Sequence, residues 1–489
     1  MACGGPHVTR VHIIGAGLAG SEAAWQAVSL GVPAVVHEMR PARQTAVHKT
    51  GNCAELVCSN SFRGDKLDNA VGLLKEEMRR LGSLVMRAAD ATRVPAGAAL
   101  AVDRERFAIE ITRALRAHPL VTFAQEEVAA IPPAGTLDGP VIVATGPLTA
   151  GALSADIAAL VGAGHLYFYD AVSPIVLAET IDMSKVFRAS RWGRSLRGKG
   201  DSHTFAGHDR ESVTVPLSGD YLNCPFTREE YERFVEAVVS AERSDAHDID
   251  NTKFFEGCLP IEVMAHRGPD TLRFGPMKPV GLVDPRTGRE AYAVVQLRQD
   301  NLAGDHFGLV GFQTQMKWGE QARVLRMIPG LEQAEFVRFG MIHRNTYINA
   351  PSVLRETGQA RRREDLFFAG QISGVEGYVE SAASGLLAGR NAAALVLGQP
   401  LRVPPRSTAL GALAYYVSHA DASHYQPTNI TFGIVAPLAA RIRKKVDRNL
   451  AISERALHDL AEWVRCGAEP SGPPREPEGL APQGSHPHA

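Results

Sequence analysis

Two cysteines stand at positions in the sequence where a thiol could take part in chemistry. Cys58 lies in ELVCSNS and Cys224 lies in YLNCP, and in both segments an apolar, strand-like run meets small polar residues or proline. Such an ending can leave a side chain exposed at a loop. An exposed thiol that loses its proton is a nucleophile or a base, whereas most free cysteines are buried and inert. Both interpretations stay open for each cysteine, including Cys258, which follows FFEG.

A glycine-rich loop near the N-terminus predicts a dinucleotide site, and its residues are Gly15, Ala16, Gly17, Leu18, Ala19 and Gly20. In this spacing the first glycine allows a tight turn, the second lets a pyrophosphate approach the backbone, and the third permits close helix–strand packing. The loop precedes a helix-length segment, whose N-terminal amides favour an anion. Glu38, near the end of the next apolar run, is the expected acceptor for the ribose hydroxyls. The alternative is an ordinary glycine turn without a ligand.

Two later segments indicate that this dinucleotide is FAD rather than NAD. A short strand ends in Ala144, Thr145 and Gly146, and a second strand leads into a segment with Gly370, Gly374, Glu376, Gly377 and Tyr378. Both resemble the nucleotide-proximal motifs of two-domain flavoproteins, a pair that NAD dehydrogenases usually lack. The alanine- and leucine-rich segment 379–397 predicts a helix whose N-terminus would stabilise negative charge on a reduced flavin. Alternatively, these glycines serve only close packing.

The overall composition narrows the class of protein. The formal net charge of -1 means that binding to nucleic acid needs local basic patches. Such patches occur around Trp192, at 361–363 and at 441–448, although a run of charges is more often solvated surface. Six scattered cysteines form no disulfide framework and no paired zinc ligands, so no metal is expected. No secretory leader or membrane span is recognisable, which favours a cytoplasmic protein that does not enter a membrane.

The expected elements give an α/β fold with a Rossmann-like FAD-binding domain that is discontinuous and carries an inserted α+β domain. Residues 8–38 read as a βαβ unit, and 141–145 and 366–369 as strands of the same parallel sheet. Residues 67–81 predict an amphipathic surface helix with solvated charges. The expected boundaries are 8–170 and 330–450 for the FAD-binding domain, 171–329 for the inserted substrate or tRNA domain, 451–466 for a C-terminal helix and 467–489 for a disordered tail.

Several longer blocks carry a resemblance to one family. They are FFEGCLPIEVMAHRG at 254–268, FGPMKPVGL at 274–282, YAVVQLRQDN at 292–301, HRNTYIN at 343–349 and GVEGYVESAASG. With the glycine loop, ELVCSNS and YLNCP, the chain resembles the folate- and FAD-dependent tRNA (uracil-5-)-methyltransferases over roughly residues 8–450. The resemblance implies methylation of uracil C5 in the T-loop of tRNA. Methylenetetrahydrofolate would donate the carbon, and FAD reduced by NADH or NADPH would be the reductant.

The same resemblance implies roles for individual residues. Cys224 would add to C6 of the uracil, and Cys58 would remove the C5 proton, because C5 is a poor nucleophile until a thiolate adds next to it. Tyr347 would stack the pterin of the folate, with a plain core or surface tyrosine as the alternative. The target base must be flipped out of the T-arm. Candidate substrate contacts are Lys278, Arg298, His343 and Arg344. The segment 188–215 is longer than the family pattern, and its role is open.

Two alternatives remain at the level of sequence. The first is the related carboxymethylaminomethyl-uridine tRNA modification flavoprotein, which is larger and has a long helical C-terminal region; no comparable stretch follows Leu450. The second is a non-catalytic flavoprotein that binds tRNA, which would give Cys224 no role. Formation of 5-methyluridine would separate the methyltransferase interpretation from both alternatives.

Overall fold

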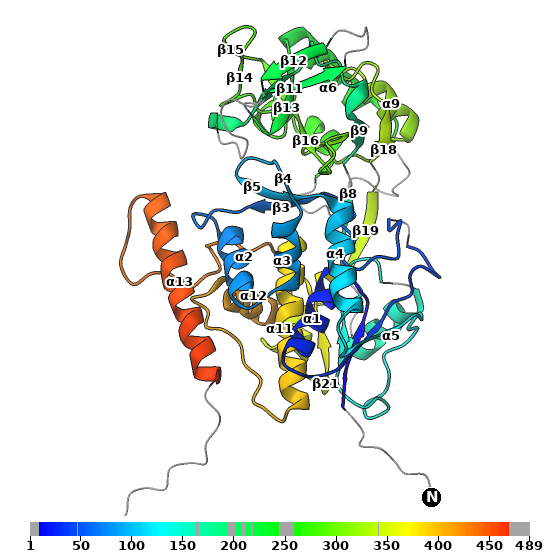
Figure 1. The fold of residues 1–489 in the computed structure, drawn as a ribbon, viewed down its shortest axis with the longest axis vertical. Coiled ribbons are helices and arrows are strands. Elements are labelled where there is room, and N and C mark those ends of the chain that lie inside the picture. The colour runs from blue at the N-terminus through cyan, green and yellow to red at the C-terminus, as the bar shows by residue number, and fades with distance from the viewer. Residues whose placement is uncertain are drawn as a thin grey trace, which may run out of the picture.

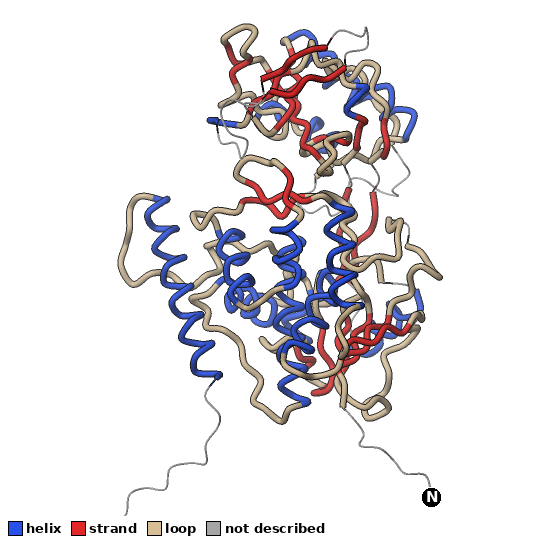
Figure 2. The backbone as a smooth tube through the Cα atoms, viewed as in Figure 1, coloured by secondary structure: helices blue, strands red, loops and turns tan. Residues whose placement is uncertain are grey.

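The computed structural model describes residues 9–45, 47–149, 151–162, 166–171, 173–193, 202–206, 212–216, 219–243, 259–340 and 342–468; the side chains of 166–171, 202–206, 212–216 and 342–344 are not part of the description. The described chain forms two lobes joined by a narrow region (Figure 1). Long helices gather in the lower lobe, and shorter helices surround the strands of the upper lobe (Figure 2). The predicted tail falls almost entirely within residues 469–489, which lie outside the described residues.

The lower lobe is built on a six-stranded sheet with the order β20-β21-β7-β1-β2-β6. All neighbours pair in parallel except β20, which is antiparallel to β21. Its strands are β1 (Val11–Ile14), β2 (Ala34–His37), β6 (Val121–Ala124), β7 (Val141–Val143), β20 (Gln359–Ala360) and β21 (Arg363–Phe368). Because β21 returns from late in the chain to pair with β7, the prediction that these two segments share one parallel sheet is confirmed.

Two helices that are distant in sequence pack side by side on this sheet. They are α1 (Leu18–Ser29) and α11 (Tyr378–Val396), which lie next to each other in Figure 1. A Cβ on Gly385 would lie 2.1 Å from the carbonyl oxygen of Ala19, and one on Gly389 would lie 2.4 Å from that of Ala23. The backbones therefore touch, and this close packing brings the N-termini of both helices to the same side of the lobe.

The remaining elements of the lower lobe surround this centre. Its helices are α2 (Ala70–Arg80), α3 (Leu84–Ala91), α4 (Arg104–Arg116), α5 (Gly151–Val161), α10 (Ala350–Val353), α12 (Ala409–His419) and α13 (Lys445–Ala468). A small sheet at the junction of the lobes contains β3 (Ser61–Gly64), β4 (Arg93–Val94) and β5 (Ala99–Val102). The C-terminal helix begins before the predicted residue 451 and packs against α2. Its Asn449 and Ser453 side chains donate to backbone carbonyl oxygens of residues 67–68, just before α2.

The prediction that α2 carries only solvated charges is wrong for two residues. Lys75 and Glu77 are fully buried. The Lys75 ammonium donates to the carbonyl oxygens of residues 62–64, and the Glu77 carboxylate accepts from the first two amides of α12 at 2.7 and 2.8 Å. Both side chains therefore satisfy buried backbone groups, while burial raises the pKa of the Glu77 carboxyl to about 8 and lowers the pKa of the Lys75 ammonium to about 8.

The upper lobe contains a second six-stranded sheet, all antiparallel, with the order β10-β13-β16-β17-β9-β18. Its strands are β9 (Ile175–Leu177), β10 (Phe187–Ala189), β13 (Tyr221–Phe226), β16 (Ala293–Gln299), β17 (His306–Leu309) and β18 (Phe336–Arg338). Its helices are α6 (Arg228–Ser240), α7 (Ile261–His266), α8 (Thr271–Phe274) and α9 (Trp318–Leu325). Because β18 belongs to this sheet, the inserted lobe continues past residue 329, where the sequence placed its end.

Paired strands connect the lobes, and direct hydrogen bonds hold them together. The strands β8 (Leu166–Ala171) and β19 (Ile342–Tyr347) run antiparallel between the lobes (Figure 1). The upper lobe also has two hairpins, which are β11 (Ser202–Ala206) with β12 (Ser212–Pro216) and β14 (Val283–Asp284) with β15 (Arg289–Glu290). Across the junction, Arg104 pairs with Asp300 at 2.8 Å, and the phenol of Tyr221 donates to the carbonyl oxygen of Ala96 at 3.0 Å.

Candidate active site

A large cavity opens at the carboxyl ends of the parallel strands in the lower lobe. It is lined by the loops that follow β1, β2, β6, β7 and β21 and by the first turn of α11, and its empty volume is about 1140 Å³. In sheets of this topology, ligands bind where the strand order reverses, and here that point lies between β1 and β7. This volume includes space open to solvent, and the lining extends from the glycine loop to the first turn of α11.

The backbone geometry of the three glycines in the N-terminal loop is compatible with the roles that their spacing predicts. Gly15 has φ +102°, a conformation that favours glycine in a tight turn. A Cβ on Gly17 would meet no protein atom within 4 Å, so the space beside it is free for a ligand. A Cβ on Gly20 would lie 1.8 Å from the carbonyl oxygen of Gly15, which shows close packing. No side chain caps the N-terminus of α1, so its first amides remain available to a phosphate.

Glu38 lies directly after β2, and it holds the glycine loop in place. Its carboxylate accepts hydrogen bonds from the amide of Ala16 at 2.8 Å and from the guanidinium of Arg40 at 2.9 Å. Burial alone would raise the pKa of the Glu38 carboxyl, but the hydrogen bonds and charge of Arg40 lower it below its ordinary value. A permanently ionised acceptor thus stands at the place where the sequence predicts contact with a ribose.

The later flavin motifs divide into residues that line the cavity and residues that support it. Thr145, Gly146, Gly370 and Tyr378 line it, together with most of the glycine loop. The others, Gly374, Glu376 and Gly377, are not among its lining residues. Gly374 packs against the phenol of Tyr425, the Glu376 carboxylate accepts from Gln371, and Gly377 is the N-cap of α11.

Cys58 lies beside Tyr378, which is the first residue of α11 and lines the cavity. Its neighbour Val57 lines the cavity, and its own side chain is partly exposed. The sulfur of Cys58 lies 3.0 Å from the phenol oxygen of Tyr378, and that oxygen accepts hydrogen bonds from the amides of Cys58 and Ser59. The predicted thiol therefore lies at a loop beside the cavity, although Cys58 itself is not among the lining residues.

Three arginines hold the loop that carries Cys58. Arg104 donates to the carbonyl oxygen of Leu56 at 2.8 Å, and Arg338 donates to that of Val57 at 2.9 Å. Arg298, a predicted substrate contact, donates to the hydroxyl of Ser59 at 2.9 Å. Two of these arginines, Arg298 and Arg338, come from the inserted lobe, so this part of the site exists only when both lobes are in contact.

Cys224 lies away from this site. The prediction that a proline ends its strand is wrong, because β13 continues through Pro225 to Phe226. Alternation along the strand turns Cys224 to the same side as Leu222 and Phe226, into the core of the inserted lobe. Its side chain is 0% exposed, and burial raises the pKa of its thiol well above the ordinary range. The role of nucleophile stays a prediction that this conformation does not support, and Cys258 lies outside the described residues.

The other predicted substrate contacts are not gathered at the cavity. Tyr347 is 5% exposed and packs against Tyr425, and burial raises the pKa of its phenol to about 12. Lys278 is an exposed residue after α8. His343 and Arg344 lie on β19, with side chains outside the description.

Several cavity residues were missed from the sequence. Glu126 and Glu127 lie in the loop after β6, one residue beyond its end, so the carboxyl-edge rule could have found them. His37 lies between Glu126, 2.7 Å from its Nδ1, and His12, 3.1 Å from its Nε2. Arg40 lies between two carboxylates, of which Glu38 is near in sequence and Glu55 lies on a different loop.

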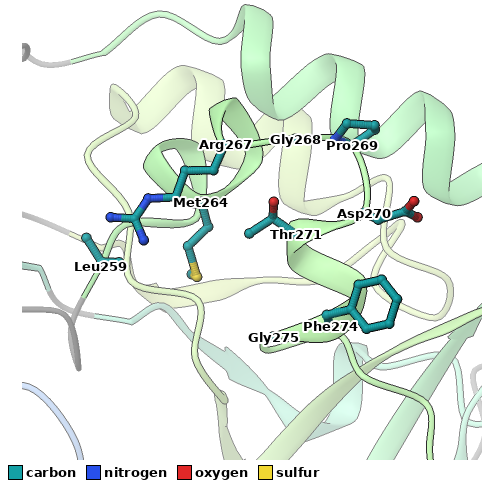
Figure 3. A pocket seen from close by; sticks show the side chains of 9 residues that line it. All are labelled: Leu259, Met264, Arg267, Gly268, Pro269, Asp270, Thr271, Phe274 and Gly275. Atoms are coloured by element: carbon teal, nitrogen blue, oxygen red, sulfur yellow. The ribbon is translucent and has the colours of Figure 1, made fainter.

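A second hollow on the inserted lobe offers no comparable chemistry. It lies between α7 and α8, with Met264 and Thr271 at its centre (Figure 3). The side chains of Arg267 and Asp270 point to opposite sides in that view, so no pair of ionisable groups converges there. Across the described ranges, we also find no cluster of three or more His, Cys, Asp or Glu side chains able to hold a metal ion. Within the same ranges, every helix is too short or too polar to cross a membrane.

The parallel sheet, the glycine loop at the switch point and the cavity beside it define a Rossmann-like dinucleotide-binding fold. Residues 10–400 match the model of the family described as Glucose inhibited division protein A. The chain belongs to this family, and its close relatives are the proteins named Methylenetetrahydrofolate–tRNA-(uracil-5-)-methyltransferase TrmFO.

Identity to these relatives extends over nearly the whole chain. The protein of that name from Symbiobacterium thermophilum is 58% identical over 462 residues, covering 94% of this chain and 97% of the relative. The one from Enterococcus faecalis is 54% identical over 456 residues, covering 93% and 99%. The solved structure of Aquifex aeolicus GidA matches with a TM-score of 0.65 at 19% identity, covering 94% of this chain and 73% of that one, and supports the fold.

Proposed function

We propose that this protein is an enzyme that methylates C5 of a uracil in the T-loop of tRNA, with methylenetetrahydrofolate as carbon donor. The observation that carries the proposal is the identity of 54–58% to relatives that bear the name of this activity. The cavity adds a physical argument, since it is lined both by the glycine loop and by Tyr378, whose phenol contacts the sulfur of Cys58. A cytoplasmic location, where tRNA is modified, follows from this proposal.

The residues of the cavity fit FAD. The open space beside Gly17 and the uncapped start of α1 would receive the pyrophosphate, and Glu38 would accept from the ribose. Gly370 packs beside Ala19 of the same glycine loop, and Tyr378, at the first turn of α11, would border the flavin ring. Bound FAD, once reduced by NADH or NADPH, would supply the carrier chemistry for the one-carbon unit and the electrons that make it a methyl group.

The protein's own part is to place the uracil and to handle a proton. Cys58 would accept the proton that leaves C5, because its sulfur lies at the loop that borders the cavity. Arg104, Arg298 and Arg338 would fix this loop, and their positive charge favours an anionic sulfur. A separate nucleophile must add to C6, and the burial of Cys224 makes its identity the first question to test.

The proposal is tested with purified flavin-loaded protein, a tRNA transcript, NADPH and methylenetetrahydrofolate labelled in its methylene carbon. We expect labelled 5-methyluridine in the T-loop, measured by nucleoside mass spectrometry, and none from a transcript in which that uridine is replaced by cytidine. S-adenosylmethionine labelled in its methyl group is the matched control and should give no label. Bound flavin with no 5-methyluridine, or label from S-adenosylmethionine alone, contradicts the proposal.

A further inference from the structure

The contacts of the Tyr378 hydroxyl identify the atom that accepts its hydrogen bond. A phenol has one O–H donor and two lone pairs. Its oxygen accepts from the amide of Cys58 at 2.9 Å and from the amide of Ser59 at 3.2 Å, so both lone pairs are in use. The third neighbour of this oxygen is the sulfur of Cys58 at 3.0 Å. The phenol therefore donates its proton to the sulfur, and the sulfur acts as acceptor.

We propose that Tyr378 is a positioning residue that holds Cys58 as a thiolate, ready to accept a proton from the substrate. A hydrogen bond donated to a sulfur favours the anionic form, because the bond to a charged partner is the stronger one. The phenol reaches the sulfur from the first residue of α11, and the N-terminus of that helix also favours negative charge. The inference rests on the proposed function, which gives the thiol its role in catalysis.

The charges around the loop support the same protonation state. Arg104, Arg298 and Arg338 surround it, and Asp300 is the carboxylate that opposes them through its ion pair with Arg104. Three positive charges against one negative charge leave an excess that an anionic sulfur balances. Burial lowers the pKa of Arg338 to about 10, so this arginine is still charged at neutral pH.

The donor itself stays protonated under the same conditions. Burial, followed by the nearby sulfur, raises the pKa of the Tyr378 phenol well above its ordinary value of 10.0. The phenol therefore keeps the proton that it donates to the sulfur at neutral pH. When the substrate reacts, the C5–H bond breaks, the proton forms an S–H bond with Cys58, and the electron pair of the broken bond stays in the uracil ring.

The test measures alkylation of Cys58 by iodoacetamide as a function of pH in the flavin-loaded protein, with the modified peptide quantified by mass spectrometry. In the unmodified sequence we expect the midpoint to lie below the ordinary thiol pKa of about 8.5. Tyr378→Phe keeps the ring and removes the donor, so its midpoint should rise by about one unit, which means about tenfold slower alkylation at neutral pH. Tyr416→Phe is the matched control, because the phenol of Tyr416 donates to the carbonyl oxygen of Gln426 instead.

Two results overturn the inference. One is a Tyr378→Phe protein that retains flavin and has the same pH profile as the unmodified sequence. The other is a result for the unmodified sequence itself. It is an alkylation midpoint of Cys58 at or above the ordinary thiol pKa, or the absence of alkylation at every pH tested. The alkylation measurement contains no RNA, folate or reductant. If the unmodified protein formed no 5-methyluridine, the proposed function would be contradicted, but the alkylation result would be unaffected.

Discussion

The burial of Cys224 leads to a prediction about stability that separates a core residue from a nucleophile. Cys224→Ala removes one sulfur atom from a side chain packed with Leu222 and Phe226. Loss of one heavy atom of this size from a core costs about 1 kcal/mol, which lowers the melting temperature by about 2–4 °C. Cys224→Ser instead buries a hydroxyl, which costs about 1–3 kcal/mol more unless it finds a partner. We therefore expect the alanine variant to be the more stable of the two.

The same burial predicts that Cys224→Ala retains covalent capture of the substrate. A thiol that faces the core of the inserted lobe does not reach a base at the cavity, so a T-arm RNA with 5-fluorouridine at the target should still form a complex that survives a denaturing gel. Cys58→Ala and Cys258→Ala are run beside it, since the burial argument covers neither of them. A Cys224→Ala protein that keeps its flavin and its stability but loses capture refutes this reasoning and supports the role implied by the family resemblance.

Three further predictions concern the dinucleotide end of the cavity. Gly17→Ala should fold normally and lose FAD, because its methyl group enters only the cavity. Gly20→Ala should instead lower the free energy of unfolding by about 1–3 kcal/mol or more, because its methyl group meets the backbone of Gly15. Urea titration measures the change in stability, and flavin absorbance measures the loss of FAD. Glu38→Gln should weaken FAD binding about tenfold or more in a flavin fluorescence titration, because it removes the charged partner of Arg40; unchanged affinity would argue against this role. Burial, with the charge of Arg40, lowers the pKa of His48 to about 4 from 6.5, so the unfolded chain binds this proton at higher pH than the folded one. The contribution to stability is present above pH 6.5 and is lost as the pH falls towards 4, by about 2 kcal/mol between pH 6.5 and 5; His48→Gln should flatten the pH dependence of urea unfolding of the apoprotein in that range.

The features that could be predicted from the sequence are those whose cause is local. The glycine loop, its helix and Glu38 occupy one βαβ unit, and the geometry of the three glycines is compatible with the roles that their spacing predicts. The long helix α11 follows from its alanine- and leucine-rich composition. In these cases the chemistry of neighbouring residues decides the outcome.

The features that could not be predicted depend on partners that are distant in the chain. Lys75 and Glu77 read as surface charges because the carbonyls and amides that bury them belong to other elements. The side of β13 that faces a core is set by the helices packed on it, so Cys224 gave no sign of its burial. The contact of Cys58 with Tyr378 joins residues 320 positions apart, and no spacing rule reaches that far.

The pairing of β21 with β7 has a consequence for the order in which the protein is made. On the ribosome, β7 emerges before the whole inserted lobe, whereas β21 emerges after it, so the nascent sheet has an open edge at β7 throughout that interval. An uncovered parallel edge is a site for pairing with other chains. Cofactor loading must wait as well, since Gly370 and α11 also follow the inserted lobe in the chain. Chains released before residue 363 should therefore aggregate and contain no flavin, and the enzyme can become active only after its synthesis is nearly complete.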